Sequence, residues 1–71
     1  MVNINKLKAK MVEREMNVES TAERIGIDKA TLYRRLKNPN EITIREADAL
    51  AEVLEMTFEE ATTIFFSQIV A

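Results

Sequence analysis

The single glycine of the chain, Gly26, constrains the fold more than any other residue, because it interrupts a helical pattern at one defined point. The pattern before it begins after Asn17, a residue type that often caps the start of a helix. Its apolar residues recur at helical spacing and are Val18, Ala22 and Ile25. Glycine readily adopts the positive φ that commonly ends a helix. The sequence therefore predicts a short helix that ends at Gly26.

A second short helix follows almost at once. Asp28 is the next residue suited to cap a helix start, and the helix that it opens covers residues 29–37. This helix ends before Pro39, because the residue that precedes a proline avoids the helical region. Two short helices joined by such a tight turn around a glycine have the spacing of a helix-turn-helix unit.

One further helix is expected before this unit, with Asn3 as its cap. Its apolar face is formed by Ile4, Leu7 and Met11, whose i, i+3, i+7 spacing is helical. The basic residues of this segment lie off that stripe and are Lys6, Lys8, Lys10 and Arg14.

Two more helices are expected after the unit, each opened by a capping box of a threonine with a glutamate three residues later. The two boxes are Thr43 with Glu46, and Thr57 with Glu60. The expected buried stripes are Ile44, Ala47, Leu50, Ala51 and Leu54 in the fourth helix, and Phe58, Ala61, Phe65 and Ile69 in the fifth. No strand pattern of period two lasts four residues. We therefore expect an all-α, compact five-helix fold, with residues 1–71 forming one domain.

The composition excludes most other function classes. A chain of 71 residues is too short for a two-domain enzyme. It contains no Cys and no His, so it lacks disulfides, thiolate metal ligands and the usual general base. We expect no catalytic residue, no metal site, no cofactor and no small-molecule ligand, and a reducing compartment such as the cytoplasm. No apolar run is long enough to span a bilayer, so no membrane partner is expected.

Charge is divided unevenly along the chain, although the net charge is only -2. Residues 1–40 carry nine basic and five acidic side chains, whereas residues 41–71 carry one basic and seven acidic ones. Within the first part, the segment 28–38 has Asp28 as its single acid and four bases, which are Lys29, Arg34, Arg35 and Lys37. Such a cluster can be an ordinary solvated helix face, so its surroundings must decide.

The expected helix at 29–37 has two different sides. Leu32 and Leu36 fall together on one side and are its core anchors. The other side is basic, partly aromatic and free of acid, and it gathers Ala30, Tyr33, Arg34 and Lys37, with Lys29 at its leading end. An α-helix with such a face suits the major groove of DNA, where Arg and Lys donate to guanine and a small Ala approaches a thymine methyl. Tyr33 could instead be a core aromatic, but its place in the basic arc favours exposure.

Residues 17–54 resemble the Cro and lambda-repressor-like helix-turn-helix family, whose short phage or prophage regulators are similar in length. The resemblance rests on Ala22 and Ile25-Gly26-Ile27 at the turn, Thr31-Leu32 in the next helix, Asn38-Pro39 after it, and Ala-Glu-Val-Leu at 51–54. In this family the helix after the turn lies in the major groove, and dimers bind two half-sites one helical turn apart.

The resemblance implies roles for individual residues. The base-reading positions are those of Lys29, Ala30, Tyr33 and Arg34, and the positions near the DNA backbone are those of Thr31, Lys37, Asn38 and Asn40. Three positions depart from the family pattern. Val18 replaces a Gln that contacts phosphate in many relatives, Thr21 replaces a larger apolar residue, and Arg35 replaces an aliphatic one. We expect Arg35 to lay its stem across the core edge with its charge in solvent.

The resemblance and the basic face together predict a sequence-specific transcriptional regulator, a Cro-like repressor that binds a double-stranded DNA operator as a homodimer. The apolar segment 64–71 is the expected dimer contact, through Phe66, Ile69 and Val70. A different class remains open, because helix-turn-helix domains also bind proteins. In that alternative the chain is an antitoxin-like or accessory interaction module, and its acidic second half is the binding face.

Overall fold

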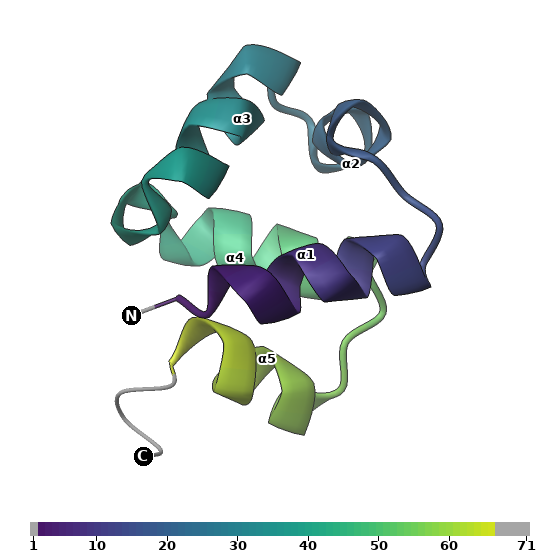
Figure 1. Cartoon of the computed structure of the whole chain (residues 1–71), viewed down its shortest axis with the longest axis vertical. Helices are drawn as coiled ribbons and strands as arrows, with labels where there is room; N and C mark the ends of the chain where they lie inside the picture. Colours follow the sequence, from purple (N-terminus) through teal and green to yellow (C-terminus); the bar gives the residue numbers. More distant parts are fainter. Residues whose placement is uncertain (1, 67–71) are drawn as a thin grey trace.

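A computed structural model describes residues 2–66, which form five α-helices and one 3-10 turn. The elements are α1 (Ile4–Glu13), α2 (Val18–Ile25), α3 (Lys29–Lys37), η1 (Pro39–Glu41), α4 (Ile44–Val53) and α5 (Phe58–Phe65). In Figure 1, α2 and α3 lie at one end of the molecule, α1 and α4 lie in the middle, and α5 lies at the opposite end. No strand occurs within residues 2–66, so the expected all-α, five-helix fold is confirmed.

All five predicted helix caps are confirmed. Each cap side chain accepts a hydrogen bond from a backbone amide two or three residues later, and the caps are Asn3, Asn17, Asp28, Thr43 and Thr57. The two predicted capping boxes are complete, because the Glu46 and Glu60 carboxylates accept from the Thr43 and Thr57 amides. Each cap stabilises its helix by about 1 kcal/mol, so these local signals fix where the helices begin.

The predicted helix end at Gly26 is also confirmed. Gly26 has a φ of 79°, and the Ile27 amide donates to the Ala22 carbonyl at 3.0 Å. The same left-handed ending closes α1 and α4, where the residues in this conformation are Glu15 (φ 56°) and Glu55 (φ 52°). In both, the next amide donates to the carbonyl five residues back at 2.9 Å. The chain therefore uses glutamate in a backbone position that glycine occupies more easily.

The main core lies between α1, α4 and α5. Its buried residues are Leu7, Met11, Ala47, Leu50, Leu54, Ile64 and Phe65. Within the helix-turn-helix unit, Thr21, Ala22 and Leu32 are buried as well. Thr21 replaces a larger apolar residue without leaving a polar atom unpaired, because its hydroxyl donates to the Asn17 carbonyl at 2.7 Å.

Two of the residues expected in the buried stripes are exposed instead. Ile44 is 77% exposed and Phe58 is 89% exposed, so placing them in the core was wrong. Each is the first residue of its helix, directly after the Thr cap, and so lies beyond the turns that pack against other helices. The buried faces are rotated away from them and centre on Ala47, Leu50 and Leu54 in α4, and on Ala61, Ile64 and Phe65 in α5. Ile69 lies outside the described residues.

Candidate DNA-binding surface

Helix α3 is attached to the domain by one side only. Leu32 is 1% exposed, and Leu36 is half-buried and packs against the core cluster. The start of α3 is fixed by Asp28, whose carboxylate accepts from the Ala30 amide at 3.1 Å. This carboxylate therefore serves as the helix cap, as the sequence predicted. The side of α3 opposite Leu32 is left open to solvent.

The four residues expected to read bases all lie exposed on α3: Lys29, Ala30, Tyr33 and Arg34. Tyr33 is 52% exposed, so its expected position outside the core is confirmed. Within residues 2–66 the Arg34 guanidinium makes no ion pair, which leaves its donors available. The helix thus presents a cation, an aromatic ring and a small methyl side chain along one accessible face.

The residues expected near the DNA backbone lie in or just after α3. Lys37, Asn38 and Asn40 are exposed, whereas Thr31 is half-buried. Asn38 closes the end of α3 without the help of a glycine, because its backbone amide and its side-chain Nδ2 both donate to the Arg34 carbonyl, at 3.0 and 3.3 Å. Pro39 then starts η1, which connects α3 to α4.

The expectation for Arg35 was half right. Its side chain is 20% exposed, so its stem covers the core edge, but its charge is not left to solvent. Nε donates to Glu46 Oε1 at 3.0 Å, and a second carboxylate, that of Glu41, lies 3.7 Å from Nη1. Burial disfavours the charged form of Glu46, but the hydrogen bonds from Arg35 and the Thr43 amide prevail and lower the pKa of this carboxyl. The pair joins α3 to the capping box of α4.

The structure adds an acid to the surroundings of the basic face, which the sequence had indicated to be free of acid. Glu19, in the first turn of α2, places Oε2 3.5 Å from the Lys29 Nζ. The two residues are ten positions apart, so helical periodicity gives no signal for this contact. Only the tight turn at Gly26 could have indicated it, because that turn sets the start of α3 beside α2.

Arg45 is a further residue that the sequence reasoning passed over. It is the only base after Asn40 in the sequence, and it is exposed at the second position of α4. No ion pair to it occurs in the part of the chain that the structure describes. Figure 1 shows the start of α4 next to the end of α3. Arg45 therefore adds an exposed positive charge at the start of α4, and its place two residues after the predicted cap Thr43 was the available signal.

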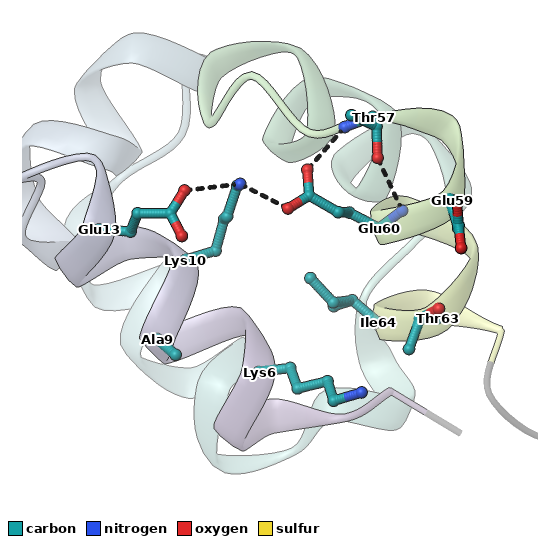
Figure 2. Close-up of a pocket in the computed structure, with 9 residues that line it drawn as sticks. All are labelled: Lys6, Ala9, Lys10, Glu13, Thr57, Glu59, Glu60, Thr63 and Ile64. Carbon is teal, nitrogen blue, oxygen red and sulfur yellow. Dashed lines mark hydrogen bonds and ion pairs between the residues drawn. The ribbon is translucent and has the colours of Figure 1, made fainter.

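A groove lies between α1 and α5, away from α3, and has a volume of about 540 Å³ (Figure 2). One of its residues is Lys10, which is 6% exposed although it lies off the predicted apolar stripe. Its Nζ lies 2.8 Å from carboxylate oxygens of both Glu13 and Glu60. The hydrogen bonds to Glu13 and Glu60 raise the pKa of Lys10. Because Lys10 is paired with both carboxylates, it does not present a free charge in the groove. Its ion pair with Glu60 instead holds α5 against α1.

No cluster of acidic side chains in residues 2–66 has the arrangement needed to hold a metal ion. None of the helices described in the structure is sufficiently long and apolar to cross a membrane.

Comparison with known proteins agrees with the geometry. The family model of the Cro/C1-type HTH DNA-binding domain matches residues 6–65, which include the starts of the four α-helices after α1 and the whole exposed face of α3. The description of this family names DNA binding and no catalytic activity. No curated protein and no solved structure gives a significant match. From the matched range and the helix-turn-helix geometry, the chain belongs to the family of Cro/C1-type helix-turn-helix DNA-binding domains.

Proposed function

We propose that the protein is a transcriptional repressor of the phage or prophage type, which binds a two-fold operator as a homodimer with α3 in the major groove. The observation that carries this proposal is the exposed face of α3, on which Tyr33 and Arg34 project into solvent from a helix anchored by Leu32. Arg34 and Lys29 donate to guanine O6 and N7, and Ala30 approaches a thymine methyl. These contacts select the base sequence.

Backbone contacts supply most of the affinity in this proposal. Lys37, Asn38 and Asn40 bind phosphates beside the recognition helix, with Thr31 near them and Arg45 added from the start of α4. The acids of α5 lie at the end of the molecule opposite α3 (Figure 1). They therefore stay away from the phosphates and lower the net charge, which limits binding to DNA of unrelated sequence.

Binding to a labelled duplex of mixed sequence, followed by fluorescence anisotropy over a series of salt concentrations, tests the DNA contact itself. We expect measurable affinity at low salt and a linear fall of log K with log salt, because each phosphate contact releases counterions. A protein that shows no affinity even at low salt would contradict the proposed function.

The homodimer is proposed because one recognition helix contacts too few base pairs for useful specificity. Of the predicted contact residues, Ile69 and Val70 lie outside the described residues, and Phe66 is 40% exposed. Phe66 lines a small apolar pocket together with Ile42 and the exposed Ile44, and this uncovered surface supports a contact to a second copy.

Two phenylalanines provide a matched pair of variants for the dimer. Phe66→Ser should weaken the dimer at least tenfold in sedimentation equilibrium, because it removes an apolar contact. Phe58→Ser should leave the dimer unchanged, since Phe58 is more exposed and does not line the pocket. If the wild type and both variants dimerise equally, Phe66 does not lie in the dimer interface.

A second candidate function rests on the exposed Phe58. This ring is 89% exposed and is flanked in sequence by Glu55, Glu59 and Glu60, so in this candidate function it is the anchor for a basic protein partner. In this case the chain acts as an antitoxin-like or accessory module. The anisotropy titration separates the two functions, because a pure protein-interaction module shows no salt-dependent affinity for duplex DNA.

A further inference from the structure

We propose that Glu19 is a specificity-determining residue, which holds the Lys29 ammonium back from phosphates so that Lys29 contributes to binding only where a base accepts it. This inference rests on the proposed DNA-binding function and adds a residue that the family resemblance does not assign. It follows from the contact between the first turns of α2 and α3.

The Glu19–Lys29 contact is loose and exposed. Nζ and Oε2 are 3.5 Å apart, and the two side chains are 63% and 60% exposed. By contrast, the ion pairs of Lys10 and Arg35 are as short as 2.8 and 3.0 Å, and the side chains of these two cations are only 6% and 20% exposed. Exposed pairs contribute little to stability. The fold therefore does not depend on this pair, and the pair can exchange for a contact to DNA.

Capping does not explain the carboxylate of Glu19. The start of α2 is already closed by Asn17 and Ser20, whose side chains accept from each other's backbone amides at 2.7 and 3.1 Å. The side chain of Glu19 bonds to no backbone amide in the described residues, and its one side-chain partner there is Lys29. The geometry thus directs this carboxylate at a predicted base-reading cation.

The effect on DNA binding follows from what replaces the pair. On an operator, Lys29 exchanges Glu19 for guanine O6 and N7, which are strong acceptors in a fixed position. On unrelated sequence only phosphates are available, and Glu19 both keeps the ammonium occupied and repels those phosphates. Lys29 therefore adds little to the binding of unrelated DNA. The affinity for the operator rises relative to the affinity for unrelated sequence.

The test compares Glu19→Gln with Glu23→Gln, a change of the same charge on the same helix. Glu23 is exposed, and in the described part of the chain its carboxylate makes no hydrogen bond or ion pair. Anisotropy titrations over a salt series would use an operator selected for the wild-type protein and a duplex of mixed sequence. Circular dichroism melts of all variants verify folding, and Glu19→Gln should melt within about 2 °C of the wild type because exposed pairs stabilise little.

We expect Glu19→Gln to bind mixed-sequence DNA roughly fivefold more tightly at about 0.1 M salt, and operator less than about twofold more tightly. Its salt slope on mixed DNA should become steeper by nearly one, as one more phosphate contact forms. Both changes should disappear in Glu19→Gln combined with Lys29→Gln, and neither should appear in Glu23→Gln. A structural role of Glu19 would not change the salt slope in this way.

Two different failures can be told apart. If the wild type does not bind the mixed duplex at low salt, the proposed function itself is contradicted. If the wild type binds but Glu19→Gln behaves like Glu23→Gln, or if its gain persists without Lys29, the role given to Glu19 is overturned and DNA binding stands.

Discussion

Replacing Gly26 with alanine changes only the backbone requirement of the helix-turn-helix turn. A Cβ added at Gly26 meets no atom within 4 Å, so the substitution creates no clash. The φ of 79° places an alanine in the left-handed region, which costs about 1–2 kcal/mol. Alanine also lowers the entropy of the unfolded chain, which offsets about 0.4–1 kcal/mol. We therefore expect Gly26→Ala to lower the free energy of unfolding by about 1 kcal/mol.

Thermal and urea unfolding, both followed by far-UV circular dichroism, measure this difference. For a domain of this size, a loss of about 1 kcal/mol lowers Tm by roughly 4–8 °C. The reciprocal change is available at the end of α4, where Glu55 has a φ of 52°. Glu55→Gly should raise the stability by about 0.5 kcal/mol, because glycine removes the same backbone cost. Unchanged stability of Gly26→Ala, or a loss above about 3 kcal/mol, would refute the reasoning.

Three further predictions concern charged residues. The pKa of Glu60 is lowered by the hydrogen bond from Lys10, so the stability that this carboxylate contributes is present above pH 4.5 and is lost as the pH falls through the lower pKa of the folded state. In urea titrations, the free energy of unfolding should therefore differ less between pH 7 and pH 3 for Glu60→Gln than for the wild type. Arg14 donates to the carbonyls of Leu54 and Glu55 at 3.0 and 3.1 Å, so Arg14→Ala should lower the free energy of unfolding in urea by about 1 kcal/mol. An unchanged urea midpoint would show that water replaces these two hydrogen bonds at no cost. Arg34→Ala should cost about 1–3 kcal/mol on the selected operator and relax one base position in a repeated selection, whereas an equal loss on mixed DNA would place Arg34 on the backbone.

The helix boundaries were predictable because their signals are local. Asn17, Asp28 and Thr43 each bond to an amide two or three residues away, so spacing in the sequence suffices. The single glycine was correctly placed at a left-handed helix end, but two further helices end in the same conformation without a glycine to signal it. Glu15 and Glu55 adopt it as well, because the bonds that close these helix ends offset the backbone cost.

Packing between helices was less predictable. Ile44 and Phe58 match the apolar period of their helices and are nevertheless exposed, because periodicity does not tell how far along a helix the neighbours reach. For the same reason the contacts of Lys10, Arg35 and Glu19 could not be read from the sequence. Each joins two helices, so its partner depends on the tertiary arrangement.

The candidate site was predictable to the extent that it lies on one helix. Lys29, Tyr33 and Arg34 share a face of α3 for geometric reasons, and burial of Leu32 on the other side makes that face accessible. The acid beside Lys29 was missed because it comes from α2. The low overall charge of the chain is no argument against DNA binding, since the acids of α5 lie at the end opposite α3 (Figure 1).

The central claim is that two copies of α3 read a two-fold DNA site, and selection of bound sequences from a pool of random duplexes tests it most directly. The account predicts enrichment of a palindromic sequence whose half-sites lie about 10 base pairs apart, centre to centre. Guanine should be enriched within each half-site, because Arg34 and Lys29 are the base-reading cations. A pool that shows no enrichment after repeated rounds, although the protein is folded and binds duplex DNA, would contradict the account.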